Sequence, residues 1–160
     1  MTQVPGRSWQ EVIDKSQKAD VPEGLWMRCP ACEAMVYRKR VEENLNVCTE
    51  CDHHYRVRAD ERARQLCDPN SFEPMWADIA PSDPLKFHDR KPYKDRLVEE
   101  QKKTSLNDAI VAGAGYIKGR RVVLACMDPF FIMGSMGSVV GEVITRAIEH
   151  ADDENLPLII

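Results

Sequence analysis

Two Cys-x-x-Cys pairs, Cys29-Pro-Ala-Cys32 and Cys48-Thr-Glu-Cys51, decide the fold of the first part of this chain. Fifteen residues separate the pairs. A gap of two residues lets one tight turn bring both thiolates of a pair to one metal ion, and the intervening segment forms a hairpin that returns the second pair. Four thiolates complete a tetrahedral shell and leave no position for water or substrate. The sequence therefore predicts one structural zinc ion per chain, bound by Cys29, Cys32, Cys48 and Cys51.

The cysteines have other conceivable roles. The two pairs could form a redox-active dithiol, but a module of about 45 residues buries too little apolar surface to fold without a staple. His53 and His54 follow Cys51 directly, yet four thiolates already complete the shell, so neither histidine is expected to bind the metal. Cys67 and Cys126 lie in apolar contexts, and we expect them to behave as small buried hydrophobes.

The segments around the cysteine pairs outline a small module. Before them, Ser8 to Lys18 has the pattern of a short amphipathic helix, and a linker follows up to Gly24. After them, a strand over 54–57 and a helix over 59–67 are expected. We therefore predict an N-terminal helix and linker over 1–21, a zinc ribbon over 22–68, and the start of an α/β domain over 69–160.

The second half of the chain shows the pattern of an α/β fold. A strand is expected within 71–79, a proline-rich connection over 80–92, and a charged helix over 93–103. Two apolar runs joined by Ile117-Lys-Gly-Arg120 predict a β-hairpin. The last segment, Leu156-Pro-Leu-Ile-Ile160, resembles a buried parallel strand. Between them, a helix is predicted whose apolar stripe should face the core; the stripe comprises Val140, Val143, Ile144, Ala147 and Ile148.

Composition excludes several classes of protein. The chain has 160 residues and a net charge of −4, whereas dedicated nucleic-acid binders usually have a strong basic excess. No apolar run approaches the roughly 20 residues that span a bilayer, and the N-terminus lacks the apolar core of a signal peptide. We therefore expect a cytoplasmic protein that does not enter a membrane. The large apolar side chains Trp26, Trp76, Phe130 and Phe131 are expected in a core or an interface.

A zinc ribbon that binds nucleic acid, or that has a regulatory role, is the alternative. Tyr37 and Tyr55 could stack on bases, and nearby basic residues could contact phosphates. Against this, residues 22–68 contain eight Lys/Arg and nine Asp/Glu, a net charge of −1. RNA or DNA binding is therefore expected at most as a secondary activity. The candidate phosphate contacts are Arg38, Lys39, Arg40, Arg56, Arg58, Arg62 and Arg64.

A loop rich in glycine and serine precedes the predicted long helix. Helix N-termini bind anions, because their first N–H groups have no partner within the helix and the helix dipole is positive there. The loop residues Gly134, Ser135, Met136 and Gly137 are therefore candidate substrate contacts. Glycine at this position can equally serve only to turn a strand into a helix at close quarters.

After residue 20, nearly the whole chain resembles the β subunit of the bacterial acetyl-CoA carboxylase carboxyltransferase. Several independent segments occur in the same order, so the resemblance is more specific than the ribbon alone. These segments are Val21-Pro-Glu-Gly-Leu-Trp26, the ribbon with Cys51-Asp-His-His54, Leu85-Lys-Phe87, Tyr93-Lys-Asp-Arg-Leu97, and Met133-Gly-Ser-Met-Gly-Ser-Val-Val-Gly141.

The resemblance implies a fold and a reaction. A crotonase-like (ClpP/crotonase) ββα superhelical domain should follow the ribbon. A partner α subunit, in a heterotetramer, and a biotin carboxylase are implied as well. The carboxyl group of carboxybiotin, held on a biotin carboxyl carrier protein, should pass to acetyl-CoA and give malonyl-CoA for fatty-acid synthesis. Backbone N–H pairs would stabilise the two developing oxyanions. Residue by residue, the four zinc cysteines carry over, and Gly134 to Gly137 should line the acyl-CoA side.

The sequence departs from the family in one respect. In the family, a Gly-Gly-Ala-Arg segment supplies the oxyanion hole of the β subunit, and these 160 residues contain no such segment. We therefore expect an incomplete carboxyltransferase domain and assign no catalytic residue. The chain alone is predicted to be inactive as a carboxyltransferase, and a stand-alone acyl-CoA-binding fragment is a third reading.

Overall fold

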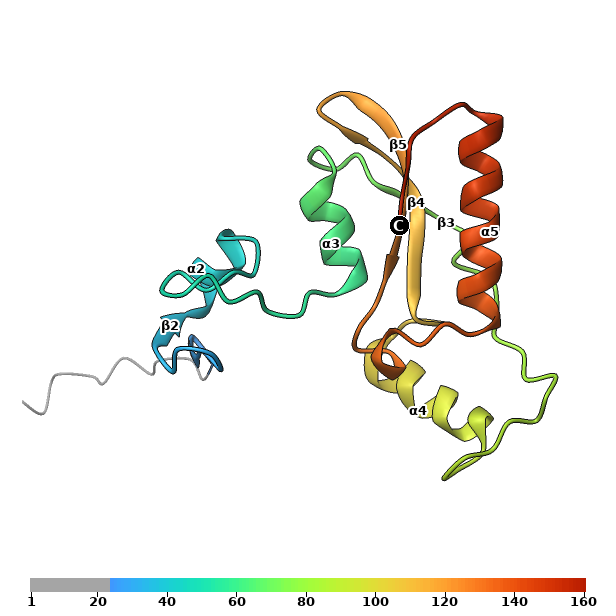
Figure 1. Ribbon diagram of the computed structural model, residues 1–160, viewed down its shortest axis with the longest axis horizontal. Helices are drawn as coiled ribbons and strands as arrows, with labels where there is room; N and C mark the ends of the chain where they lie inside the picture. The colour runs from blue at the N-terminus through green and yellow to red at the C-terminus, as the bar shows by residue number, and fades with distance from the viewer. Residues whose placement is uncertain (1–23) are drawn as a thin grey trace, which may run out of the picture. The chain divides into compact units, whose positions relative to one another are not determined.

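The computed structural model describes residues 24–160 (Figure 1). The predicted helix over 8–18 and most of the predicted linker lie outside the described residues. The chain divides into two units, with the boundary between Tyr55 and Arg56, and each unit is described by itself.

The first unit consists of two short strands, a short helix and the loops that carry the cysteines. Strands β1 (Trp26–Arg28) and β2 (Met35–Tyr37) pair antiparallel, with Met27 opposite Val36. Helix α2 (Arg38–Glu43) follows β2 directly. The core of this unit holds only four buried residues, Cys29, Val36, Val41 and Cys48, so half of it is made of cysteine.

Local predictions for this unit were only partly right. The two cysteine turns and the short strands around them are present, but α2 was not predicted. The expected strand over 54–57 does not form; only His54 makes an isolated bridge, to Val47. Trp26, expected in a core or an interface, is 55% exposed and so is not part of the core of this unit.

The second unit is built on a four-stranded sheet with the order β3-β4-β5-β6. The first three strands are antiparallel neighbours, and β6 pairs parallel to β5, as the sequence predicted for the last strand. Figure 1 shows α5 on one side of this sheet and α3 on the other. The strands are β3 (Glu73–Met75), β4 (Ile110–Ile117), β5 (Arg120–Met127) and β6 (Leu158–Ile159), and the helices are α3 (Ala59–Leu66), α4 (Tyr93–Thr104), the 3-10 helix η1 (Ile132–Gly134) and α5 (Ser138–Asp153).

The predicted hairpin is present as β4 and β5, and its turn consists of Lys118 and Gly119. Both residues have positive φ, 50° and 74°, as a two-residue type I′ turn requires. The carboxylate of Asp68 accepts hydrogen bonds from both turn amides, at 2.9 Å from Lys118 N and 2.8 Å from Gly119 N. The turn is therefore fixed by its own sequence and by a side chain far away in the chain.

Alternate residues of β5 bury the two faces of the sheet. Val123 and Ala125 pack against α5, together with Ala112 of β4. Val122 and Leu124 point to the other face, where Cys67 at the end of α3 packs on them. Both faces are covered, which explains why β5 is a continuous apolar run and not an alternating one.

Helix α5 is amphipathic as predicted. Of the predicted stripe, Val140, Val143 and Ala147 are buried and Ile144 packs against the core. Val139 and Ala151 are buried as well. Ile148 was expected in this stripe, but it is 49% exposed. The helix face that packs on the sheet is the one with Val143 and Ala147, and Ile148 lies at its edge.

Helix α3 belongs to the second unit. It was predicted as the last element of a ribbon module ending at residue 68, but the chain divides after Tyr55. The physical reason is the sheet: Cys67 buries itself against Val122 and Leu124, and the amide of Ala59 donates to Asp128 Oδ2 at 3.1 Å. These contacts tie both ends of α3 to the second unit.

The proline-rich segment 80–92 contains no helix and, as predicted, no regular strand; His88 and Pro92 form one isolated bridge. Helix α4 then runs one residue further than expected, and it ends where Ser105 adopts φ 61°. Within residues 24–160, no helix is long and apolar enough to cross a membrane.

Candidate functional site

The two cysteine turns have the same backbone hydrogen bonds. In the first, the amide of Glu33 donates to Cys29 O (2.9 Å), and the amide of Cys29 donates to Ala34 O (2.9 Å). In the second, the amide of Asp52 donates to Cys48 O (3.1 Å), and the amide of Cys48 donates to His53 O (2.8 Å). Each turn also places the residue after its second cysteine at positive φ, 62° for Glu33 and 58° for Asp52. Two equivalent knuckles therefore present their thiols in the same way.

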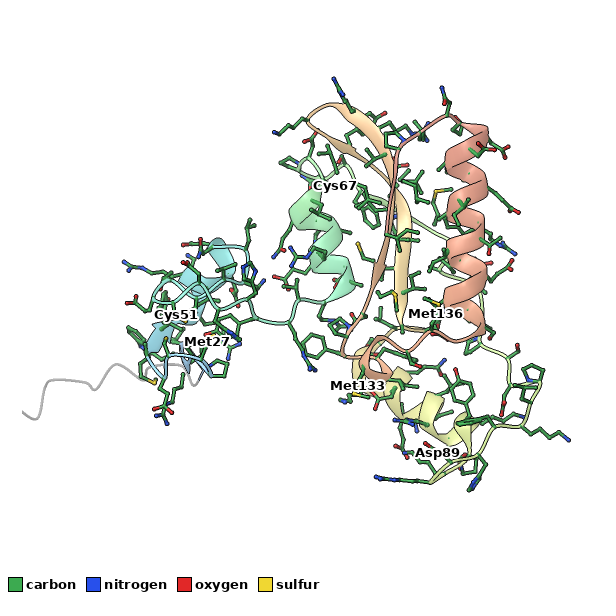
Figure 2. All side chains as sticks on the ribbon, in the orientation of Figure 1. Met27, Cys51, Cys67, Asp89, Met133 and Met136 are labelled. Atoms are coloured by element: carbon green, nitrogen blue, oxygen red, sulfur yellow. The ribbon has the colours of Figure 1, made fainter. Side chains whose placement is uncertain are left out.

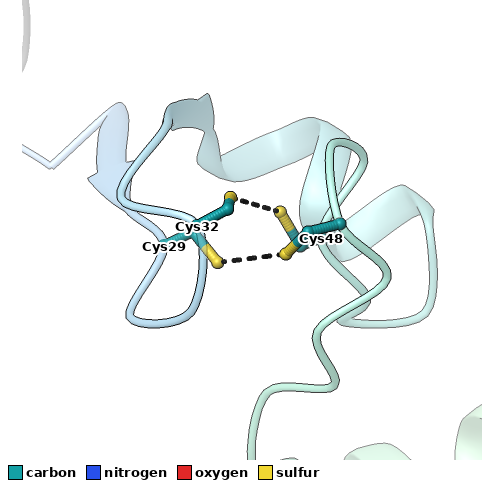
Figure 3. Close-up of side chains that lie close together, drawn as sticks. Cys29, Cys32 and Cys48 are labelled. Carbon is teal, nitrogen blue, oxygen red and sulfur yellow. Dashed lines mark hydrogen bonds between the residues drawn. The ribbon is translucent and has the colours of Figure 1, made fainter.

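The four thiols meet at one point. Figure 3 shows them facing each other across the gap between the knuckles, and all four sulfur atoms lie within 4.8 Å of one another. The Cys29 and Cys51 sulfurs are 3.7 Å apart, and those of Cys32 and Cys48 are 3.9 Å apart. A disulfide would need about 2.05 Å. A tetrahedral zinc ion with Zn–S bonds of about 2.3 Å places its sulfur ligands about 3.8 Å apart, so the residues present fit zinc.

The electrostatics of the cluster also favour a cation. Burial acts to raise the pKa of the Cys29 thiol, but amide hydrogen bonds from Cys32 and Ala31 and the nearby Tyr55 hydroxyl outweigh it and lower the pKa to about 5. At Cys51, the hydrogen bond from the His53 amide acts to lower the pKa, whereas burial and the neighbouring thiols raise it to about 12. Four thiolates cannot share this small volume without a positive charge, and a bound zinc ion supplies it.

Neighbouring groups complete the surroundings of the cluster. The described residues that can meet at this point as metal ligands are the four cysteines, so His53 and His54 are not among them. The ring of His53 packs edge-on against that of Tyr55, with centroids 5.2 Å apart. The Tyr55 hydroxyl is buried without a regular hydrogen bond, and its interaction with Cys29 raises the pKa of Tyr55. Tyr55 therefore contacts the cluster through its hydroxyl, while its ring packs against His53.

The predicted substrate loop lies at the entry to α5. Figure 2 labels Met133 and Met136 where the chain enters this helix; they are 80% and 66% exposed. Gly134 has φ 74°, which favours glycine. A pocket of about 370 Å³ adjoins the loop. Its lining includes the three loop residues Ser135, Met136 and Gly137, the apolar Leu85, Phe87 and Ile132, and the polar Tyr93 and Arg96.

Other predicted residues are dispersed. Phe131 is buried and Trp76 packs against the core, whereas Phe130 is 42% exposed. Burial raises the pKa of both Cys67 and Cys126, which fits their predicted role as apolar residues without chemistry. Arg58 donates to Thr104 O at 2.7 Å, and its Nε lies 3.6 Å from the buried Asp128, so this arginine is engaged inside the second unit.

The described residues include two buried carboxylates that the sequence did not reveal. Asp108 and Asp128 are only 3% and 0% exposed. In the sequence, Asp108 precedes β4 and Asp128 follows β5. The residues around an aspartate next to a strand do not indicate whether it is buried. Asp128 accepts from the amide of Ala59, far away in the sequence, whereas Asp108 accepts from the amide of its neighbour Ala109.

Comparison with known protein families covers both units. Residues 26–51 match the acetyl-CoA carboxylase zinc finger domain, and residues 59–160 match the carboxyl transferase domain. The acetyl-coenzyme A carboxylase carboxyl transferase subunit beta of Rhodopirellula baltica is 53% identical over 145 residues, which cover 91% of this chain and 46% of that protein. Its counterpart from a Synechococcus strain is 49% identical over 154 residues, which cover 96% of this chain and 53% of that protein. The chain thus spans about half the length of these relatives.

Solved structures share the fold. A transcarboxylase 12S crystal structure with methylmalonyl-coenzyme A and methylmalonic acid bound superposes with a TM-score of 0.50 at 26% identity, covering 64% of this chain and 18% of that chain. A single-chain, multi-domain long-chain acyl-CoA carboxylase gives a TM-score of 0.51 at 22% identity, covering 66% of this chain and 11% of that chain. The predicted fold class, a zinc ribbon followed by a crotonase-like carboxyltransferase fold, is confirmed.

Proposed function

Because this chain belongs to the carboxyl transferase domain family, we propose that it forms the N-terminal part of the β subunit of acetyl-CoA carboxylase carboxyltransferase. The reaction moves the carboxyl group of carboxybiotin to acetyl-CoA and gives malonyl-CoA, the building block of fatty-acid synthesis. One observation carries the proposal: a single chain joins a zinc finger of the acetyl-CoA carboxylase type to a carboxyl transferase domain.

In this function the zinc ion is structural. It would be held by Cys29, Cys32, Cys48 and Cys51, whose four sulfur atoms fill a tetrahedral shell. A closed shell leaves no position for substrate, so the ion supplies folding free energy and takes no part in carboxyl transfer. Biotin is supplied on a separate carrier protein.

The loop from Gly134 to Gly137 is proposed to contact acetyl-CoA. It is exposed, it borders a pocket with apolar walls, and it leads into the N-terminus of α5. The first N–H groups of a helix have no partner within the helix and face anionic groups favourably. The loop can therefore hold a polar part of the coenzyme while Leu85 and Phe87 contact an apolar part.

Partners follow from the same proposal. The chain should bind a carboxyltransferase α subunit, in a heterotetramer, and should act with a biotin carboxylase and a biotin carboxyl carrier protein in the cytoplasm. No catalytic residue is assigned within the 160 residues, and the chain alone is proposed to be inactive. The α subunit would complete the surface on which the two substrates meet.

The test compares the chain with a version extended by the C-terminal half of the Rhodopirellula baltica relative. With an α subunit and a carboxylated biotin carrier, the extended protein should form malonyl-CoA and the 160-residue chain should not. Malonyl-CoA formed by the purified chain without a partner would refute its proposed inactivity. An extended protein that neither captures the α subunit nor forms malonyl-CoA would overturn the β-subunit assignment.

Two methionines of similar exposure test the substrate loop. Met136→Glu places a negative charge in the loop, and Met35→Glu places the same charge on the ribbon, where Met35 is 61% exposed. In the extended protein, Met136→Glu should weaken coenzyme A binding about tenfold or more, because a like charge approaches the phosphates. Met35→Glu should leave the affinity unchanged. If both variants bind coenzyme A with equal affinity, the loop is not part of the binding site.

Nucleic-acid binding by the ribbon is a second candidate, and one observation favours it. The exposed Trp26 lies beside Tyr37, and their ring centroids are 5.6 Å apart. Tyr37 directly precedes the basic triplet over 38–40. Aromatic rings next to basic side chains suit single-stranded nucleic acid. Arg40→Ala should then reduce RNA binding and its salt dependence. If the affinity for RNA changes neither with salt concentration nor in Arg40→Ala, nucleic-acid binding by the ribbon is ruled out.

A further inference from the structure

Tyr93 has a hydroxyl group that opens into the pocket beside the proposed substrate loop. Tyr93 is the first residue of α4, and its side chain packs against the core cluster around Leu97. A Cβ atom added to Gly137 would lie 3.1 Å from the Tyr93 hydroxyl oxygen, and both residues line the pocket. Within residues 24–160 this hydroxyl makes no hydrogen bond, and it is not among the polar atoms that are fully buried without a partner. It is therefore free to bind a ligand in the pocket.

The walls around this hydroxyl are largely apolar. They include the side chains of Leu85, Phe87, Ile132 and Met136. The volume of the pocket, about 370 Å³, lies in the range of about 300–1,000 Å³ that small-molecule sites occupy. Such a pocket suits a ligand with a hydrocarbon part and a few hydrogen-bonding groups.

The charges of the pocket do not favour a phosphate group. Among the described residues, its lining has two charged side chains, Asp83 and Arg96. The Nη1 of Arg96 lies 3.3 Å from Asp89 Oδ2. Hydrogen bonds from two neighbouring amides, together with Arg96, lower the pKa of Asp89, so this carboxylate stays ionised and compensates the arginine. Asp83 then leaves the pocket with a negative charge, which repels an anion.

The Tyr93 hydroxyl is suited to donate a hydrogen bond to a neutral acceptor. Burial, and after it the carboxylates of Asp108 and Asp83, raise the pKa of Tyr93, so the phenol keeps its proton at neutral pH. A carbonyl oxygen of an amide is such an acceptor, and it brings no charge into a pocket with apolar walls. Secondary amides joined by short alkyl links make up the pantetheine arm of coenzyme A.

We propose that the Tyr93 hydroxyl donates a hydrogen bond to an amide carbonyl of the pantetheine arm of acetyl-CoA, while the apolar walls contact the methylene groups of the arm. This inference rests on the proposed function and adds to it the part of the coenzyme that the pocket holds. The phosphates of the coenzyme stay outside the pocket, away from Asp83.

The experiment is an NMR titration of the zinc-loaded 160-residue chain with pantetheine, followed at the amides of Phe87 and Gly137. Tyr93→Phe removes the hydroxyl and keeps the ring. Tyr116→Phe is the matched control, because Tyr116 lies on β4, is 43% exposed and does not line the pocket. Adenosine 3′,5′-bisphosphate, a phosphate-bearing fragment of the coenzyme, is the second probe.

Pantetheine should shift both signals in a saturable way, and Tyr93→Phe should weaken its binding about three- to tenfold, as expected when one neutral hydrogen bond is lost. Tyr116→Phe should bind like the original chain, and the bisphosphate should leave both signals unchanged. The proposal is overturned if pantetheine causes no saturable shift, if Tyr93→Phe binds it as before, or if the bisphosphate displaces it.

This titration needs neither an α subunit nor a carboxylated carrier. Pantetheine binding can therefore fail while the extended protein forms malonyl-CoA, which would overturn the role of Tyr93 and leave the proposed function intact. Conversely, pantetheine binding that depends on Tyr93 would support this role even if the extended protein forms no malonyl-CoA.

Discussion

The two units of this chain reach a folded state by different means. In the ribbon, two of the four core residues are cysteines of the metal cluster, and the strands are only three residues long. In the α/β unit, apolar side chains cover both faces of one sheet: those of α5 cover one face, and Cys67, directly after α3, and Phe72 pack on the other. The ribbon therefore depends on a bound ion, whereas the second unit depends on the area that it buries.

Removal of zinc should separate the two units most clearly. Apparent zinc-binding free energies of structural sites are about 10–16 kcal/mol, more than a core of four residues can replace. We expect chelation, or Cys48→Ser, to unfold residues 24–55 while β4 and β5 keep their slow amide exchange. Hydrogen exchange with mass spectrometry of peptides measures this. Cys126→Ser is the control and should keep one zinc per chain. Slow exchange of the ribbon amides without zinc would contradict the comparison.

The reverse experiment weakens the sheet and leaves the metal site alone. Leu124 is fully buried between the strands and α3, and Leu124→Ala should lower the free energy of unfolding of the second unit by about 2–5 kcal/mol. Urea unfolding followed by exchange in β4 and β5 measures it, with zinc content unchanged. Leu85→Ala is the matched control, because Leu85 is 85% exposed and its loss should cost less than about 0.5 kcal/mol. Equal losses would show that burial does not govern this unit.

Features with a local cause could be predicted from the sequence. The metal cluster follows from the spacing of two cysteine pairs, and the hairpin follows from Lys118-Gly119 between apolar runs. The parallel β6 follows from a short apolar segment after a helix. In each, a few neighbouring residues hold the whole signal.

Features that depend on distant contacts could not be predicted. Helix α2 has one apolar residue, Val41, in six positions, too few to show a period. The exposure of Ile148 depends on how α5 rotates onto the sheet, which its own sequence does not define. Asp108 and Asp128 look like ordinary polar residues beside a strand, and only the folded chain buries them.

Asp128 offers a smaller effect at the junction of α3 with the sheet. Its fully buried carboxylate accepts hydrogen bonds from Ala59 N at 3.1 Å and Phe130 N at 2.8 Å. Asp128→Ala leaves these two amide donors without an acceptor and removes the ion pair with Arg58, whose Nε lies 3.6 Å from Asp128 Oδ2, so the second unit should lose about 1–3 kcal/mol. Thermal unfolding measures the loss, and exchange in α3 should rise first. Asp78→Ala, at an exposed carboxylate, is the control. Unchanged α3 protection would mean that Asp128 does not cap this helix.

Asp68 makes similar bonds in an exposed place, so it should matter least. It accepts from the Lys118 and Gly119 amides, but water can replace it at the turn, and the loss in Asp68→Ala should be about 0.5–1.5 kcal/mol. Asp68→Asn keeps one acceptor oxygen and should lose roughly half of that. Exchange of the two turn amides measures both variants. If Asp68→Ala loses as much stability as Asp128→Ala, burial does not set the strength of these backbone hydrogen bonds. The exposed and the buried carboxylates of the second unit would then contribute equally.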